Sequence, residues 1–341
     1  MSGGCSDVSF YWQAAKGHLD LLSRKQNIQD LIQNPDTEAE LVRKLKLVLQ
    51  VREFAVSRLS LPKQPGYSGY VDLERPYVTM VVRAAPPLKF KAHQWCYWFI
   101  GCQEYRGYFD AEKARNYATA MDPELDISVR PVSAYSTLGW FNRSWIPDYF
   151  SDPVLSTFVN SKDPVLAATL IHEMAHQVVY VKNDTSFNES FATFVEEEGL
   201  KQFYREQKIQ NKSDLVWYHG AKRDRERFRQ LILETYQKLD QLYGLKLEDS
   251  EKIEQKKQIF KQLKENFTKS KNQFEVLNYS KWFHQDLNNT HLLGVRRYHR
   301  ETDAFRRLFE KQNRKWKDFF AKVRELAEES KEDRQKLLNQ K

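Results

Sequence analysis

The feature that most restricts the fold is an apolar segment, residues 163–181, that carries two histidines four positions apart. Asp163 is a suitable helix N-cap, and Pro164 suits the first helical position, where no amide donor is missed. The apolar residues that follow predict a buried helix. On such a helix His172 and His176 lie one turn apart on the same face, so they can share one ion.

Glu173 directly follows the first histidine, where its carboxylate can take a proton from a metal-bound water. His172, Glu173 and His176 together form the HExxH pattern of zinc peptidases. Two neutral imidazoles leave the charge of Zn²⁺ largely uncompensated, so a third, anionic ligand and an open position for water are expected. The metal lowers the pKa of that water towards ~7 for attack on a carbonyl. The alternative is a buried helix whose histidines are structural and whose Glu173 pairs elsewhere.

Glu189 is the predicted third ligand. Twelve residues separate it from His176, enough for the helix to end and a second helix to return. Ser186 and Glu189 also fit a capping box, in which Glu189 would only bond the backbone amide of Ser186. Glu196, two turns further along the same face, is the alternative ligand, or an acceptor that orients a histidine.

The remaining pattern is helical at both ends and mixed in the middle. Residues 6–60 predict two helices, the second capped by Asp36 and Thr37, and the chain beyond residue 151 is helical almost throughout, with a break at Gly244. Residues 77–139 contain β-branched and aromatic runs that predict a small sheet and one helix.

The net charge of +8 is concentrated in residues 201–341, which hold 34 Lys/Arg against 22 Asp/Glu. The two signs alternate at helical spacing, as in residues 223–227, which is typical of a solvated helix face. No nucleic-acid-binding motif accompanies the charge, so we expect no nucleic-acid partner. No run approaches 18 apolar residues, so no segment is expected to span a membrane.

The three cysteines form no CxxC pair. Cys96 and Cys102, separated by five residues, can form a short-loop disulfide in an oxidising compartment. Cys5 follows Ser2-Gly3-Gly4, small residues like those that precede a lipid-modified bacterial cysteine. A free thiol at Cys5 is the alternative.

Residues 188–192, Asn-Glu-Ser-Phe-Ala, resemble the asparagine-glutamate element of gluzincin metallopeptidases, whose glutamate is the third zinc ligand, although the gap after HExxH is usually longer there. Over nearly its whole length the chain is similar to a bacterial family of predicted aminopeptidases. The strings that carry this similarity are residues 11–14, 101–102, 105–109, 134–141, the HExxH helix, residues 188–194, and Asn288-Asn289 followed by Tyr298.

The resemblance implies a peptidase with one Zn²⁺ ion and a peptide substrate. It also implies, for many members, an exported lipoprotein whose mature chain begins at a cysteine like Cys5. We therefore expect lipidation at Cys5, a membrane lipid anchor, a disulfide between Cys96 and Cys102, and a periplasmic location in the bacterial cell envelope. The leader segment of such a lipoprotein is then expected to be missing from this chain.

The expected fold is α+β, helix-rich and zincin-like. Residues 1–76 form an N-terminal helical region, residues 77–200 the catalytic core with its small sheet, and residues 201–341 a helical region packed on that core, all as one integrated domain. Zincins bind substrate along an edge strand, for which residues 135–141 are the candidate. Tyr135 or Tyr298 is the predicted oxyanion donor; the alternative is that both are packing residues.

The predicted function is a zinc aminopeptidase acting on short peptides. Glu196, Glu197 and Asp184 are candidates for binding the free α-amine. The aromatic residues at 95 and 97–99 favour core packing over a substrate pocket. Two alternatives stay open: an endopeptidase with the same metal site, and a non-catalytic envelope scaffold. An intact Glu173 favours an enzyme, because a structural zinc needs no base. The oligomeric state cannot be read from the residues.

Overall fold

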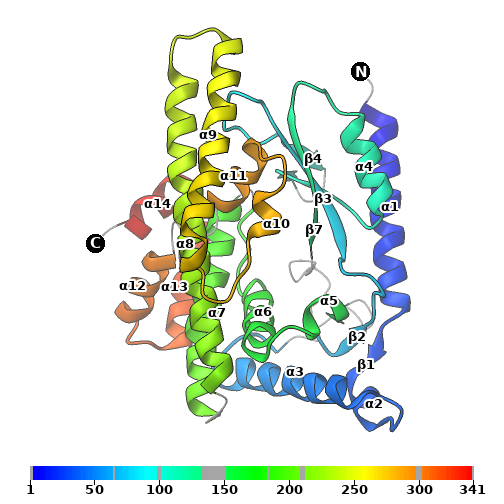
Figure 1. The fold of residues 1–341 in the computed structure, drawn as a ribbon. Coiled ribbons are helices and arrows are strands. Elements are labelled where there is room, and N and C mark those ends of the chain that lie inside the picture. The colour runs from blue at the N-terminus through cyan, green and yellow to red at the C-terminus, as the bar shows by residue number, and fades with distance from the viewer. Residues whose placement is uncertain are drawn as a thin grey trace. The chain divides into compact units, whose positions relative to one another are not determined.

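The computed structural model describes residues 3–63, 66–97, 101–132, 151–182, 184–207, 212–296 and 302–339 (Figure 1). The chain divides into two compact units, each built from segments that are distant in the sequence. Unit 1 comprises Met1–Met80, Pro131–Gln210 and His299–Lys341, and unit 2 comprises Val81–Arg130 and Asn211–Tyr298. These units do not follow the consecutive ranges 1–76, 77–200 and 201–341.

The predicted helix-rich α+β class is confirmed. The helices of unit 1 are α1 (Gly3–Ser23), α2 (Ile28–Gln33), α3 (Ala39–Ser57), α5 (Ser156–Val159), α6 (Asp163–Ala175), α7 (Thr185–Glu206), α12 (Thr302–Lys311), α13 (Trp316–Glu328) and α14 (Lys331–Asn339). Those of unit 2 are α4 (Ala111–Thr119), α8 (Lys212–Gly244), α9 (Asp249–Ser270), the 3₁₀ helix η2 (Lys271–Gln273), α10 (Ser280–Phe283) and α11 (Asn289–Arg296).

The strands form three small sheets among the described residues. In unit 1, β2 (Gly69–Val71) pairs antiparallel with β1 (Gln26–Asn27) and parallel with β8 (Val154–Leu155). A second sheet has the order β6 (Arg106–Tyr108), β3 (Thr79–Ala85), β7 (Asp126–Val132). The third is the antiparallel hairpin of β4 (Trp95–Tyr97) and β5 (Gly101–Gln103), in which Cys96 and Cys102 face each other and form a disulfide.

Helix α6 is the centre of unit 1. Its apolar residues Leu166, Leu170 and Ile171 are fully buried, and it packs between α3 and α7. Gly199 of α7 makes this packing close: a Cβ at that position would lie 2.7 Å from Leu59 Cδ1 and 3.1 Å from Ile171 Cγ2. The missing side chain therefore lets α7 approach α6 next to the first histidine of the HExxH motif.

The opposite face of α7 carries aromatic side chains that pack against the C-terminal helices. The Phe191 ring centroid lies 5.7 Å from that of Phe305 on α12, and the Phe194 centroid lies 5.1 Å from that of Phe319 on α13. All four side chains are fully buried. Burial of this aromatic surface holds one face of α7 against α12 and α13, while the opposite face packs on α6.

Unit 2 is built around the long helices α8 and α9, which pack side by side (Figure 1). Helix α8 ends at Gly244, as predicted. The buried Asp224 of α8 accepts hydrogen bonds from the backbone amides of residues 275–277, at 2.8–3.0 Å. Asn289, at the start of α11, donates to the carbonyls of Pro86 and Pro87, both at 3.0 Å. These bonds connect the irregular segments of unit 2 to its helices.

Two predicted helix caps are wrong. The N-cap of α6 is Lys162, and Asp163 lies inside the helix. The carboxylate of Asp163 instead accepts hydrogen bonds from Arg43 and Lys44 of α3, at 2.6–2.9 Å, because these cations compete for it more strongly than a backbone amide. Helix α3 has Glu38 as its N-cap, without a side-chain cap bond, in place of Asp36 or Thr37.

The structure leaves two further predictions untested, the edge strand and the lipid-modified cysteine. The predicted edge strand at 135–141 lies outside the described residues. Cys5 lies within α1, and its predicted lipidation stays a prediction. Among the helices of the described chain, none is long and apolar enough to cross a bilayer.

Candidate metal centre

Helix α6 supplies the two histidines. The helix ends at Ala175 and His176 is its C-cap, with its amide 3.4 Å from the carbonyl of His172. The two imidazoles are therefore one turn apart, and their ring centroids are separated by 4.9 Å with an interplanar angle of 82°. His176 is buried and His172 is largely covered, so both side chains are held by packing.

The segment after α6 reverses the chain and positions α7. Asn188 fixes this reversal with two hydrogen bonds to Val181: its Oδ1 accepts from the backbone amide at 2.9 Å, and its Nδ2 donates to the carbonyl at 2.8 Å. Asp184 is the N-cap of α7 and accepts from the amide of Phe187 at 3.4 Å. Glu189 therefore lies in the first turns of α7 and is not the partner of a capping box at Ser186.

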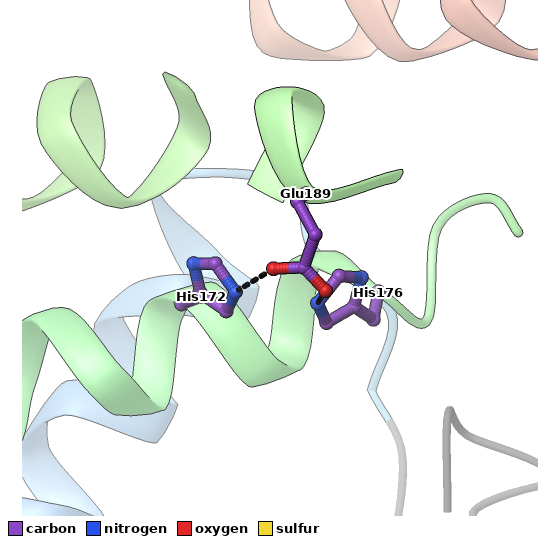
Figure 2. Close-up of side chains that lie close together, drawn as sticks. All are labelled: His172, His176 and Glu189. Atoms are coloured by element: carbon purple, nitrogen blue, oxygen red, sulfur yellow. Dashed lines mark ion pairs between the residues drawn. The ribbon is translucent and has the colours of Figure 1, made fainter. Parts of the chain in front are cut away.

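Figure 2 shows Glu189 pointing from α7 towards the two imidazoles of α6. Its Oε2 lies 3.4 Å from His172 Nε2, and its Oε1 lies 3.9 Å from His176 Nε2. One ligand atom from each of the three residues lies within 4.8 Å of the other two. The structure thus brings together the three side chains that the sequence predicts as metal ligands.

Glu196 occupies the position of the orienting acceptor, one of its two predicted roles. Its Oε2 lies 3.1 Å from His172 Nδ1, and the residue is about two turns along α7 from Glu189. A carboxylate at Nδ1 favours the tautomer that carries the proton there, which leaves Nε2 free to coordinate a cation. In this structure Glu196 therefore contacts the histidine that would bind the metal.

The protonation of the site follows from its burial and its carboxylates. Burial would lower the pKa of His172, but Glu189 and Glu196, with a contribution from Glu173, outweigh it and hold that pKa well above 6.5. Burial and the adjacent His172 lower the pKa of His176 to about 4. Burial would raise the pKa of Glu189, yet the hydrogen bond to His172 and the charges of both histidines keep it below its usual range.

These residues fit a divalent cation. Two ligands of one tetrahedral zinc ion, bound at about 2.0–2.1 Å, are about 3.4 Å apart, and the distance from His172 Nε2 to Glu189 Oε2 is 3.4 Å. Two imidazoles and one carboxylate are a donor set that zinc accepts. The carboxylates of Glu173, Glu189 and Glu196 all act on His172. A bound cation would balance the negative charge of these carboxylates. Without a cation, a proton on His172 offsets part of that charge.

The other predicted site residues are placed as follows. Glu173 is half-buried on α6. Tyr135 and Tyr298 lie outside the described residues, so their predicted role stays a prediction. The three candidates for binding an α-amine all have protein partners: Glu196 bonds His172, Glu197 forms an ion pair with Arg306 at 2.9 Å, and Asp184 forms one with Arg334 at 2.9 Å.

The aromatic residues of β4 belong to the core, as favoured from the sequence. Trp95 and Tyr97 are each 6% exposed. Trp95 Nε1 donates to the hydroxyl of Tyr117 on α4 at 2.8 Å, which satisfies its buried polar group.

Two residues that support the site were not predicted. Asn188 was noted as part of the Asn-Glu string, but its bonds to Val181 depend on the loop conformation. Arg334 lies 150 positions from its partner Asp184, and both side chains are nearly inaccessible to solvent. A local pattern holds no signal for such a pair, because the neighbours of Arg334 in α14 are mostly charged.

Comparison with known proteins places the chain in a family. A family model described as "Putative aminopeptidase" matches residues 9–338. The chain therefore belongs to this family, which the strings noted in the sequence resemble. No curated protein and no solved structure matches the chain. The family's name suggests peptidase activity on a peptide substrate.

Proposed function

We propose that the protein is a zinc-dependent, zincin-like metallopeptidase and acts as an aminopeptidase on short peptides. One observation carries the proposal: His172, His176 and Glu189 converge on one point from two packed helices, and Glu173 adjoins the first of them in the sequence. Membership of the aminopeptidase family supports the substrate class. The HExxH spacing supports zinc and a hydrolytic mechanism.

Each residue has a defined part in this proposal. His172, His176 and Glu189 hold the ion. A Zn²⁺ ion at this position supplies Lewis acidity towards a peptide carbonyl and makes water a nucleophile at neutral pH. Glu173 accepts the proton from the attacking water and returns it to the departing amine, as a general base and then a general acid. Glu196 holds the ring of His172 in the coordinating tautomer.

We also propose the bacterial cell envelope as the location, with a lipid anchor at Cys5. The disulfide between Cys96 and Cys102 supports an oxidising compartment such as the periplasm, because such bonds are rare in the cytosol. Mass spectrometry of the protein from its native membrane would test the anchor: a diacylglyceryl modification on Cys5 supports it, and an unmodified thiol there excludes it.

Substitution of Glu173 by Gln tests the enzyme proposal. The variant should bind one zinc per chain with the affinity of the wild type, since Glu173 is not a ligand. Hydrolysis of amino-terminal fluorogenic peptides should fall by about 10²- to 10⁴-fold, the usual contribution of general acid–base catalysis. The half-buried Glu206, at the far end of α7 in an ion pair with Arg58, provides the control Glu206→Gln, which should keep full activity.

The outcomes separate the alternatives. Preference for internally quenched peptides over amino-terminal ones would make the protein an endopeptidase. If zinc binds and no peptide is cleaved by the wild type, the scaffold alternative takes precedence. If neither zinc nor another divalent ion binds, the ligand assignment itself is wrong.

A further inference from the structure

Two arginines of unit 2 bury hydrogen-bond donors that have no acceptor. Arg83 lies on β3 and Arg130 on β7, adjacent strands of one sheet (Figure 1). Nε of Arg83, and Nε and Nη2 of Arg130, are shielded from solvent and have no hydrogen-bond partner. In the part of the chain that the structure describes, neither arginine forms an ion pair with an acid.

Other arginines of this protein have the carboxylate partners that Arg83 and Arg130 lack within the described part of the chain. Arg223 and Arg227 both pair with Glu275, Arg306 pairs with Glu197, and Arg334 pairs with Asp184. These four arginines thus each have a carboxylate partner. The unpaired arrangement of Arg83 and Arg130 differs from this pattern, and burial of guanidinium donors without acceptors is unfavourable.

The groups around the two arginines leave their buried donors without a partner among the described residues. The guanidinium carbon of Arg130 lies 5.7 Å from the ring centroid of Trp282 on α10. This ring offers its face to the cation, but the N–H groups in the guanidinium plane still need acceptors. His291 of α11, 5% exposed, lies within electrostatic reach of Arg130, Arg83 and Lys264 of α9, and their charges oppose its protonation.

The electrostatic consequences are consistent with an uncompensated cluster. Burial and the charge of Arg83 lower the pKa of Arg130 to about 10. Burial, the charge of Arg130, and smaller effects of Arg83 and Lys264 lower the pKa of His291 to about 3, despite its hydrogen bond with Asn288. A positive potential of this kind attracts anions.

We propose that Arg83 and Arg130 form a binding site in unit 2 for a small oxoanion, a carboxylate or a phosphate group. Arginine presents its N–H groups as a planar fork that matches two oxygens of such a group. The Nε and Nη2 atoms of Arg130 lie on one edge of that fork, and both are unpartnered. Trp282 packs against the guanidinium and restricts its orientation. This site shares no residue with the metal centre and does not depend on the proposed peptidase activity.

Binding of inorganic phosphate and of acetate to the full-length protein tests the proposal. Each anion is titrated calorimetrically against a background of chloride at constant ionic strength, and the melting temperature is recorded in parallel. We expect at least one of them to bind and to raise the melting temperature of the wild type. Arg130→Gln and Arg83→Gln should each weaken binding by about tenfold or more, because each removes a charge-assisted donor.

The control is Arg225→Gln, which removes the same charge from an exposed position on α8 of the same unit and should leave binding unchanged. Circular dichroism establishes that each variant is folded; if Arg130→Gln is not, Arg83→Gln decides. Binding of phosphate alone points to a phosphorylated ligand, and binding of acetate alone to a carboxylate ligand. No binding beyond chloride, or an equal loss in Arg225→Gln, overturns the proposal. Glu173→Gln should retain anion binding, which separates this site from the peptidase proposal.

Discussion

The state of His172 depends on the two carboxylates that bond its opposite ring nitrogens. Glu189 lies 3.4 Å from Nε2 and Glu196 lies 3.1 Å from Nδ1. Without a cation this arrangement favours the protonated ring, since burial is outweighed and the pKa of His172 is raised. With a cation at Nε2, the proton on Nδ1 remains and donates to Glu196. The same two acids therefore serve both states, and Glu196 keeps the ring in one orientation throughout.

Glu196→Gln should weaken zinc binding by about 10- to 100-fold, the usual effect of losing an acceptor behind a ligating histidine. The amide can still accept a hydrogen bond, but it no longer supplies the negative charge that makes the imidazole a better ligand. Competition titration with a fluorescent zinc chelator measures the change. Glu206→Gln, on the same helix, is the control. Equal zinc affinity in the two variants would remove Glu196 from any role at the metal.

At the residue level the HExxH pattern and the spacing to Glu189 predicted which three side chains would converge. His172 and His176 are one turn apart in any helix, and the gap to Glu189 permits a return to the same point. The role of Glu196 could not be decided in advance, because it depends on which face of α7 meets α6. Arg83 and Arg130 gave no signal either. Their relation arises from strand pairing between segments 47 positions apart, and neighbours in a sheet leave no local pattern.

His291 should make the protein less stable in acid. Its pKa is about 3 in the folded chain and about 6.5 when unfolded, so between these values only the unfolded chain binds the proton. Stability from this residue is therefore complete above pH 6.5 and is lost as the pH falls, by about 2 kcal/mol at pH 5. In urea unfolding at pH 7 and pH 5, His291→Gln should reduce the difference by that amount. The exposed His219→Gln should not, and an unchanged difference in His291→Gln would refute the assignment.

Among the secondary-structure elements, α7 is fixed at its beginning by the last helix of the chain. Arg334 of α14 donates to the Asp184 carboxylate at 2.9 Å, and its guanidinium carbon lies 5.4 Å from the ring centroid of Phe187. Asp184 caps α7, and Glu189 follows five residues later. The side chains of the ion pair are 6% and 4% exposed. Removal of Arg334 leaves the buried Asp184 carboxylate, within the described chain, with only the Phe187 amide at 3.4 Å and Lys331 at 3.9 Å, so most of its charge is uncompensated.

Arg334→Met should lower the free energy of unfolding by about 3–5 kcal/mol, as expected when one partner of a buried ion pair is lost. Lys336→Met is the matched control on the same helix. Its partner Asp333 is exposed, and the substitution should cost less than about 0.5 kcal/mol. Chemical denaturation of both variants measures the difference. Similar stabilities would show that the contact between Arg334 and Asp184 contributes little to holding α7.

The elements themselves could be predicted far better than their ends. Helical periodicity identified α3, α6 and the long charged helices, and β-branched runs identified β3 and β7. The caps at Asp163 and at Asp36 or Thr37 were wrong, because a capping residue is chosen by its surroundings as well as by its type. Arg43 and Lys44 of α3 form ion pairs with the carboxylate of Asp163, because α3 packs on α6 and brings these cations close to it.

For the whole molecule, the division into two units could not be predicted from the order of the elements. Each unit is made of segments that are separated in the sequence by segments of the other unit. Unit 2, for example, consists of residues 81–130 and 211–298. Composition changes along the chain mark the mixed segment and the charged helices, yet they do not show which segments join. The proposed metal ligands come from a single stretch, residues 172–189, which lies entirely within unit 1. For that reason the convergence of these three residues was predictable, while the joining of distant segments into units was not.

The metal should stabilise the whole chain through this one stretch. A cation that binds only the folded site adds RT ln(1 + [L]/Kd) to the free energy of unfolding, about 2.7 kcal/mol at a free concentration 100 times Kd. Addition of a chelator to the zinc-loaded protein should therefore lower its melting temperature. It should also speed amide hydrogen exchange at the end of α6 and the start of α7, with α9, which carries no ligand, as the reference. His176→Ala removes a ligand, so its melting temperature and exchange should not respond to the chelator. A wild-type protein with the same melting temperature and exchange before and after chelation would show that no cation binds between these helices.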